Sequence, residues 1–401
     1  MQLSQTDWII IALFFVITLI IGLSVAKKSG ESSAEFFLSG RKMPWWLLGI
    51  SMVATTFSAD TPNLVTDIVR VNGVAGNWAW WAFLLTGMLT VFVYARLWRR
   101  SAVTTDLEFY ELRYSGAEAR LLRGFRAFYL GVVFNVLIMG TVMLAGIKIA
   151  GILLGMSAVE TVLIVSVITV IYSSFGGLRG VLYTDFFQFI VAMVGMVWAC
   201  IYIVNMPEIG GLNQLLAHEA VKAKMDMLPS FDNHEMMISL FIIPIAVQWW
   251  STWYPGAEPG GGGYVAQRML SAKDETNAVT ATLLFNIAHY ALRPWPWILI
   301  ALASLIVFPN VSDIATKFPA LDPQYVKNDL AFPAMLSFLP SGLLGMVIAA
   351  LIAALMSTLS THLNWGSSYL VNDLYHRFYK PEADQKELVR VGQASTVVLM
   401  L

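Results

Sequence analysis

The sequence predicts an all-α protein that crosses a membrane many times. Of its 401 residues, 57% are hydrophobic and only 13% are charged, whereas about 25% charged residues is usual for soluble domains. A membrane helix needs about 20 consecutive apolar residues, and ten segments of the chain are candidates. They lie at 8–26, 43–69, 76–97, 120–154, 157–174, 177–205, 235–254 with its continuation, 275–308, 338–374 and from 388 onward.

The first and last of these segments need separate interpretation. The segment 8–26 lacks the basic leader and small-residue cleavage site of a signal peptide, so we expect it to remain as a membrane helix. The last segment stops at Leu401 in mid-span. We therefore expect the chain to be a fragment that lacks at least one further helix.

Several classes of function find no support in the composition. The single cysteine, Cys200, excludes a disulfide within the chain and a cysteine-based zinc site. The net charge is -1 and no Lys/Arg cluster with interleaved aromatic residues occurs, so nothing indicates nucleic-acid binding. The expected surroundings are a lipid bilayer, and no obligatory protein partner is indicated.

Basic residues predict the orientation, because cytoplasmic loops of membrane proteins are enriched in Lys and Arg. Most basic residues outside the candidate spans fall on one side of the alternating topology, and Arg268 is counted with them. The two long polar loops, 206–234 and 309–333, fall on the other side. We expect a multi-pass protein of the plasma membrane with its N-terminus outside.

Two of the apolar segments are interrupted by residues that break helices. The second contains TTFSADTPNL at 55–64, and the seventh runs into YPGAEPGGGGYVAQR at 254–268. Irregular backbone survives at membrane depth only where it is buried in protein or lines a cavity, and paired broken helices in two halves of a chain indicate a transporter's binding site. The alternative is that 255–263 is a cytoplasmic loop and Pro62 an ordinary kink.

The ninth segment carries a cluster of hydroxyl side chains. Ser357, Ser360 and Thr361 share one helical face at i, i+3 and i+4, and Thr358 points about 100° away from it. Hydroxyls together with free carbonyls supply the oxygen ligands that a hard cation such as sodium requires. The alternative is that these small polar residues mediate helix contacts.

Ionisable residues within membrane spans are functional candidates by default. Asp60 lies in the broken second segment, and Asp185 lies about two turns into the sixth. In the eighth, Asn286, His289 and Arg293 recur at i, i+3 and i+7 on one face, which must look inward. The alternative for this face is a polar network that holds the Pro294–Pro296 kink.

The chain resembles the sodium:solute symporter family, which includes sodium/glucose, sodium/proline and sodium/sialic-acid cotransporters. The matching stretches occur in the family's order along nearly the whole chain; they are FFLSGRKMPWWLLGISMVATTFSAD (36–60), TDLEFYELRYS (105–115), YSSFGGLRGVLYTDFFQFIV (172–191), VAQRMLSAKDE (265–275) and AALIAALMSTLSTHLN (349–364). The resemblance implies a single transporter domain over 1–401 with a leucine-transporter-like fold of two inverted five-helix repeats. Segment 8–26 would be an appended helix, 43–205 the first repeat and 235–401 the second, C-terminally truncated.

The resemblance also implies sodium-coupled symport by alternating access. The family's common sodium site maps onto the carbonyls of Ala54, Phe57 and Ala354 and the hydroxyls of Ser357 and Thr358. Some members bind a second ion, for which the matching positions are Asp185, Ser360 and Thr361. We favour two sodium ions.

The solute is expected to be a sugar or related polyol, with a carboxylate or an amino acid as the alternative. Aromatic faces suit sugar rings, whereas Arg293 with His289 would suit a carboxylate. Positions that contact sugar in sugar-transporting members are Thr61 and a glycine near Gly262 here, and Tyr264 stands where those members place a gating tyrosine. The candidate pocket residues are Asp60, Thr61, Trp249, Trp250, Tyr264, Asn286, His289 and Arg293.

Other classes of protein are alternatives to a carrier. An intramembrane enzyme is not expected, because no protease-type Asp pair, GxSG-type serine site or HExxH motif occurs. A channel would differ from a carrier in its flux, which would not saturate at low solute concentration. A transporter-like sensor domain is the remaining alternative.

Overall fold

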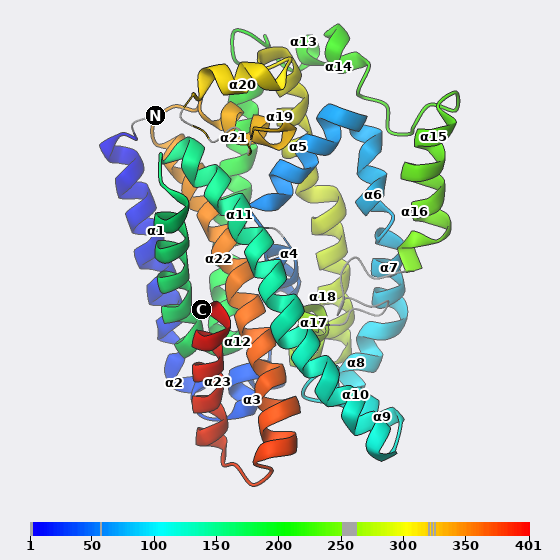
Figure 1. The fold of residues 1–401 in the computed structure, drawn as a ribbon, viewed down its shortest axis with the longest axis vertical. Helices are drawn as coiled ribbons and strands as arrows, with labels where there is room; N and C mark the ends of the chain where they lie inside the picture. The colour runs from blue at the N-terminus through cyan, green and yellow to red at the C-terminus, as the bar shows by residue number, and fades with distance from the viewer. Residues whose placement is uncertain (1–2, 57, 251–262, 320, 322–323, 325) are drawn as a thin grey trace.

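The computed structural model describes all residues except 1–2, 57, 251–262, 320, 322–323 and 325 (Figure 1). The described residues form helices and loops with no strand among them, and one isolated bridge joins Met43 to Ala272. Six helical segments are long and apolar enough to cross a membrane: Gln5–Ser24, Val74–Ser101, Gly116–Leu153, Ala158–Val204, Glu275–Val307 and Leu343–Tyr379. Trp45–Thr55 and His234–Ala246 are shorter apolar helices. The all-α, multi-pass membrane class is therefore confirmed.

The α-helices of the first half follow one another along the chain. Their bounds are α1 Gln5–Ser24, α2 Ala26–Ser29, α3 Ser33–Leu38, α4 Trp45–Thr55, α5 Asp60–Asn72, α6 Trp78–Trp81, α7 Leu84–Leu89, α8 Ala95–Ser101, α9 Glu108–Arg113, α10 Gly116–Phe128, α11 Asn135–Leu153 and α12 Ala158–Val204. Short π-helical segments at Thr90–Tyr94 and Tyr129–Phe134 join α7 to α8 and α10 to α11.

The second half has the same all-helical character. Its α-helices are α13 Leu212–Ala217, α14 Glu219–Lys222, α15 His234–Met237, α16 Ile243–Ala246, α17 Gly263–Ser271, α18 Glu275–Ile287, α19 Pro294–Val307, α20 Val311–Lys317, α21 Ala331–Leu336, α22 Leu343–Tyr369 and α23 Gln385–Met400. π-Helical segments at Ala288–Leu292 and Leu370–Tyr379 follow α18 and α22.

The expected spans 157–174 and 177–205 are two helices that meet at Gly177 within α12, with no loop between them. Gly177 has φ 52° and ψ −163°, a conformation that glycine adopts without steric cost. A Cβ atom at this position would also lie 2.7 Å from the carbonyl oxygen of Phe36. The glycine therefore permits both the turn and the close approach of α3.

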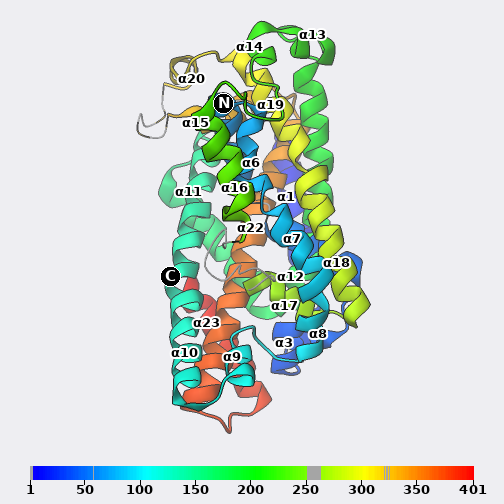
Figure 2. The same cartoon turned by 90° about the vertical axis from the view of Figure 1, so that its right-hand side faces the viewer.

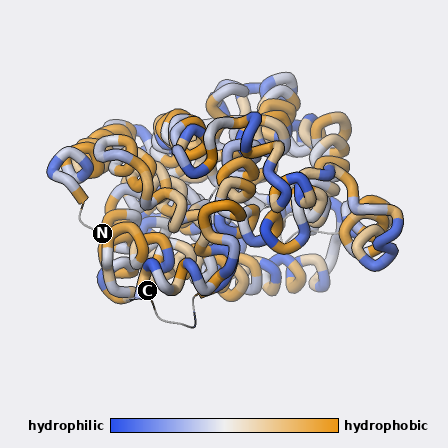
Figure 3. Tube along the Cα trace, turned by 90° about the horizontal axis from the view of Figure 1, so that it is seen from above, coloured by the Kyte–Doolittle hydropathy of each residue, from blue (hydrophilic) through white to orange (hydrophobic). Residues whose placement is uncertain are grey.

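Helix α22 is the central helix of the molecule. In its most apolar stretch 89% of the residues are buried, against 28% for α1, and it packs against α1, α11, α12 and α23. Seen from above, hydrophobic residues colour much of the helical surface, including peripheral helices (Figure 3). The hydroxyl side chains of α22 are therefore enclosed by protein, whereas outward helices present apolar side chains to lipid.

The second expected span is broken where the sequence predicted. Helix α4 ends at Thr55 and α5 begins at Asp60. The two halves have different neighbours: α4 packs against α12, α18 and α22, and α5 against α19 and α21. The break in the seventh span falls largely on 251–262, outside the described residues, and α17 follows it in the lower half of the molecule beside α8 and α18 (Figure 2).

The two ends of the molecule are formed by different loops and short helices. The N-terminus lies at the same end as α13, α14 and α20 of the two long loops (Figure 1). The opposite end carries α3 and α9, and Arg123 and Arg377 form ion pairs there with Glu111.

Candidate functional site

A cavity of about 290 Å³ lies where the broken second span meets the eighth and ninth expected spans. It is lined from both sides of the break, by Thr56 at the end of α4 and by Asp60 and Thr61 at the start of α5. Two polar residues of α22, Thr358 and His362, line it from another side. The cavity thus joins the helix break to the hydroxyl cluster of α22.

Six of the eight residues predicted for the solute pocket line this cavity: Asp60, Thr61, Tyr264, Asn286, His289 and Arg293. Trp249 is not among the described lining residues, and its carbonyl accepts a hydrogen bond from Thr86. The side chain of Trp250 lies outside the described part of the chain.

A chain of hydrogen bonds crosses the cavity wall from the eighth span to α4. Arg293 lies 3.3 Å from His289 Nε2, and His289 Nδ1 lies 3.1 Å from the hydroxyl of Thr56. Since a guanidinium only donates, Nε2 accepts and Nδ1 carries the proton that it donates to Thr56. The Thr56 hydroxyl in turn donates to the carbonyls of Met52 and Val53 at 3.1 and 3.0 Å. His289 is therefore a neutral imidazole that links Arg293 to the end of α4.

Asn286 presents an acceptor to the same cavity. Its amide nitrogen donates to the carbonyl of Thr282 at 2.8 Å, while its buried Oδ1 has no hydrogen-bond partner among the described residues. A Cβ atom at Gly87 would lie 1.8 Å from this Oδ1. The glycine therefore leaves room for the Asn286 carboxamide, whose oxygen keeps the capacity to accept a hydrogen bond.

Aromatic side chains complete the wall of the cavity, and two of them, Trp80 and Tyr290, are not among the residues predicted from the sequence. Trp80 stacks on Tyr290 with ring centroids 5.9 Å apart and contacts the ring of His289 edge-on. Tyr264 meets His362 edge-on at 5.6 Å. Trp80 is one of several tryptophans in NWAWW (77–81), so no local pattern distinguished it. The adjacency of Tyr290 to His289 was the one available signal.

The predicted first sodium site lies beside the cavity. Thr358 donates to the carbonyl oxygens of Thr55 and Ala354 at 3.0 and 3.2 Å, so its hydroxyl connects the end of α4 with α22. Ser357 points elsewhere, since its hydroxyl donates to Asp185 at 2.6 Å. Phe57 lies outside the described residues.

The predicted second sodium site centres on Asp185, which is fully buried. Its two carboxylate oxygens accept hydrogen bonds from Ser51 at 2.5 Å and Ser357 at 2.6 Å. Thr361 lies 3.0 Å from the hydroxyl of Thr55. Ser360 donates to the carbonyl of Ser357. The structure thus brings Asp185 and the hydroxyl cluster together, with Ser357 rather than Ser360 in contact with the carboxylate.

Arg268 is the residue that sequence reasoning misassigned. Its place in the sequence predicts a basic residue of the cytoplasmic face, but its side chain is completely buried and lies 3.8 Å from Asp185. It sits in α17, whose residues are all buried. In the sequence, a basic residue near the end of a span cannot be distinguished from a loop residue. Arg268 is buried in the protein interior because α17 packs against α4 and α22.

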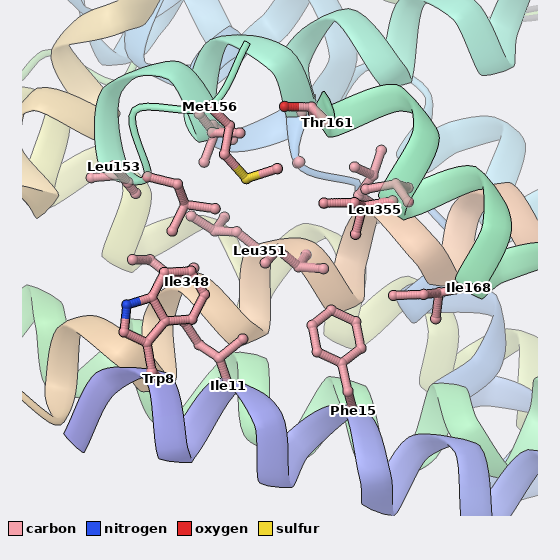
Figure 4. Close-up of a pocket in the computed structure, with 18 residues that line it drawn as sticks. Trp8, Ile11, Phe15, Leu153, Met156, Thr161, Ile168, Ile348, Leu351 and Leu355 are labelled. Atoms are coloured by element: carbon pink, nitrogen blue, oxygen red, sulfur yellow. The ribbon is translucent and has the colours of Figure 1, made fainter. Parts of the chain in front are cut away.

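A second cavity, of about 150 Å³, is apolar, unlike the cavity at the helix break (Figure 4). Trp8, Ile11 and Phe15 of α1 face Ile348 and Leu351 of α22 across it. Almost all of its lining is hydrocarbon, with Thr161 as a polar exception. It offers a polar solute no orienting groups, so the cavity at the helix break is the candidate site.

Comparison with known proteins places these features in a family. The model of the sodium:solute symporter family matches residues 36–401. The chain is 26% identical over 415 residues to a sodium/glucose cotransporter of Vibrio parahaemolyticus, covering 100% of this chain and 74% of that protein. It is 27% identical over 422 residues to a sodium/mannose cotransporter of Bos taurus and 25% identical over 430 residues to a sodium/myo-inositol cotransporter of Homo sapiens, covering all of this chain and 68% and 60% of those proteins.

A solved structure shares the fold. It is the substrate-bound, outward-open state of a sodium-coupled sialic acid symporter, with a TM-score of 0.77, 19% sequence identity, and coverage of 99% of this chain and 79% of that one. The family model covers most of the chain, and the helical fold agrees with it. The chain therefore belongs to the sodium:solute symporter family.

Proposed function

We propose that the protein is a secondary active transporter that couples sodium entry to the uptake of an uncharged polyhydroxylated solute, a sugar or a polyol. The observation that carries the choice of solute is the charge balance of the cavity. Among its described lining residues, the charged side chains are one carboxylate, Asp60, and one guanidinium, Arg293. His289 is neutral by its hydrogen bonds. A lining of balanced charge suits an uncharged solute better than an anion.

The remaining groups support the same solute class. Asn286 Oδ1 and the Asp60 carboxylate can accept hydrogen bonds from hydroxyls of a solute. Trp80 and Tyr290 supply an aromatic surface, which packs well against the apolar face of a sugar ring. The names of the sugar and inositol cotransporters that the chain resembles agree with this proposal.

A carboxylate or amino-acid solute is the second candidate, and Arg293 is the observation that favours it. A guanidinium in a buried wall is well suited to bind a carboxylate in bidentate fashion. In the described geometry, however, Arg293 is directed to His289 and to the carbonyl of Val53 at 3.5 Å. In this geometry Arg293 stabilises the cavity wall through these two contacts, rather than pointing at a bound carboxylate.

The first sodium ion is proposed to bind at the break between α4 and α5. Its ligands would be the carbonyls of Ala54, Phe57 and Ala354 and the hydroxyls of Ser357 and Thr358. The contact of Thr358 with the carbonyls of Thr55 and Ala354 supports this assignment, because it gathers neutral oxygens from α4 and α22 within hydrogen-bonding distance. Such oxygens suit a hard cation.

The second sodium ion is proposed to bind at Asp185 with Ser360 and Thr361. The position of Asp185 beside the hydroxyl cluster of α22 supports this proposal, because a carboxylate and neighbouring hydroxyls supply the oxygen ligands that a hard cation prefers. Its hydrogen bond from Ser357 makes the two ion sites neighbours.

The topology completes the proposal. Residues 43–205 and 235–401 are assigned to two inverted repeats after the appended helix 8–26, within one transporter domain over 1–401. The membrane is the plasma membrane with the N-terminus outside, in agreement with the long loops at that end (Figure 1). Sodium would hold the broken helices open to the outside until the solute binds and the helices rearrange.

A thermal-shift screen tests the solute class. Sugars, polyols, carboxylates and amino acids are added to the purified protein in sodium buffer and in potassium buffer, because a ligand of the folded state raises its apparent stability. We expect a sugar or polyol to raise the melting temperature in sodium only. A shift produced by a carboxylate alone would favour the second candidate.

A further inference from the structure

The guanidinium of Arg268 lies beside Asp185 and Thr361, two of the residues proposed for the second sodium ion. It donates to Thr361 at 2.7 Å, to Thr55 at 3.3 Å and to Ser51 at 3.2 Å. Its closest approach to Asp185 is 3.8 Å, and both side chains have zero exposure. The hydroxyl oxygens of Thr361, Thr55 and Ser51 thus already accept hydrogen bonds from a cationic side chain next to Asp185.

Ser51 links the two charges. Its hydroxyl donates to Asp185 at 2.5 Å and accepts from Arg268 Nε. The remaining donors of Arg268 are directed to its own helix, to the carbonyl of Tyr264 at 3.4 Å and to Gln267 at 3.2 Å. Arg268 is therefore fixed in place by α4, α17 and α22 together, with Asp185 as its nearest counter-charge among the ion pairs of the described residues.

We propose that Arg268 is a built-in cation that takes the place of the second sodium ion in this conformation, so that Arg268 and sodium compete for Asp185. This inference rests on the proposed sodium coupling. It adds that the protein holds one sodium ion, at the α4 break, as long as α17 keeps Arg268 in its present position. A second ion enters only when Arg268 withdraws.

Two physical effects oppose simultaneous occupancy. Two unit positive charges about 4 Å apart repel strongly where water does not screen them, and Asp185 supplies only one negative charge. A sodium ion also needs lone pairs directed at it, and the Thr361 hydroxyl already accepts from Arg268 and is hydrogen-bonded to Thr55, which reduces what it can offer a second cation. Withdrawal of Arg268 requires a shift of α17 against α4 and α22, which couples the second ion to a change of conformation.

Equilibrium binding of radioactive sodium to the purified full chain in detergent tests the inference, because it requires no knowledge of the solute. The unsubstituted protein is expected to bind one ion per chain. Arg268→Gln removes the cation but keeps hydrogen-bonding groups, and its stoichiometry is expected to double. Arg268→Lys retains a positive charge and is expected to bind one ion. The double variant Arg268→Gln with Asp185→Asn is also expected to return to one.

The matched control is Arg70→Gln. Arg70 is also a buried guanidinium, but it donates to Ser304, Phe308 and Asn328. Its substitution is expected to leave the sodium count at one. An increase to two in this variant would contradict a specific role for Arg268.

Other outcomes separate the inference from the proposed function. Two ions bound to the unsubstituted protein, falling to one in Asp185→Asn, would overturn the inference and leave sodium coupling intact; this comparison needs no Arg268 variant to fold. One ion in a folded Arg268→Gln would overturn it as well. No sodium bound by the unsubstituted protein would contradict the proposed function itself.

Discussion

The hydroxyl of Thr358 donates a hydrogen bond to the carbonyl oxygen of Thr55, 3.0 Å away. Thr55 is the last residue of α4, and Thr358 lies in the middle of the central helix α22. A second acceptor, the carbonyl of Ala354, lies 3.2 Å from the same hydroxyl. The break in the second span and the hydroxyl cluster of the ninth, which are about 300 residues apart in sequence, therefore form one oxygen-rich site.

Thr358→Val is expected to weaken sodium activation. The substitution keeps the side-chain shape but removes one proposed oxygen ligand, and a hydrogen-bonding interaction with a charged group contributes about 1.5–3 kcal/mol. The sodium concentration for half-maximal uptake should rise at least roughly tenfold. Thr280→Val is the control, because the Thr280 hydroxyl donates only within α18, to the carbonyl of Thr276. Equal effects of the two substitutions would argue against a sodium site at Thr358.

Gly87→Ala is expected to reduce solute affinity. The added Cβ atom would lie 1.8 Å from Asn286 Oδ1 and must displace the carboxamide that we assign to the solute. Gly140→Ala is a matched control, because a Cβ atom there meets nothing within 4 Å. Solute titrations followed by thermal shift should show weaker binding for Gly87→Ala alone. Unchanged solute binding in Gly87→Ala would contradict the assignment of Asn286 as a residue that contacts the solute.

His289→Leu is expected to abolish or strongly reduce solute binding and to destabilise the fold. It removes the acceptor of Arg293 and the donor to Thr56, and a buried polar group that loses its partner costs about 1–3 kcal/mol. His289→Gln can still accept through its oxygen and donate through its nitrogen, so it should retain more binding. Melting temperatures and solute titrations of both variants test this order. Better function in the Leu variant than in the Gln variant would be inconsistent with the hydrogen-bond chain.

Glu111 is expected to make stability depend on acid pH. Hydrogen bonds from Arg377 and Arg123 lower the pKa of its carboxyl from 4.5 to about 2, against the opposing effect of partial burial. Because the pKa is lower in the folded state, the stabilisation is fully present above about pH 4.5 and is lost as the pH falls towards about 2. Glu111→Gln should therefore lower the melting temperature at pH 7, and the difference from the unsubstituted protein should narrow below pH 4.5.

The control for Glu111 is the exposed Glu118 of the neighbouring helix α10. Glu118→Gln is expected to change the melting temperature little at any of these pH values. A difference for Glu111→Gln that is the same at pH 7 and pH 3 would show that its effect is not electrostatic.

Sequence reasoning predicted the features that depend on chain-local chemistry. The break at 55–64 follows from polar and helix-breaking residues in an apolar segment, and the shared face of Asn286, His289 and Arg293 follows from helical spacing. Arg268 and Trp80 could not be found in this way. Their positions depend on how α17 and α6 pack against distant helices, and long side chains near span ends reach inward or outward according to that packing.

The helix boundaries, too, could be predicted only in part from the sequence. The apolar segments 157–174 and 177–205 were recognised, but the absence of any loop between them was not. That detail depends on one glycine, Gly177, whose backbone conformation is available to few other residues. It also depends on the contact of Gly177 with Phe36, which is remote in sequence.

Uptake into proteoliposomes under an inward sodium gradient tests the central claim most directly. The sugar or polyol that gives the largest thermal shift is supplied in radiolabelled form outside vesicles loaded with potassium buffer. The account predicts transient accumulation above the external concentration, which disappears when sodium is equal on both sides or replaced by potassium. Uptake that reaches only the external concentration, at the same rate in sodium and in potassium, would contradict it.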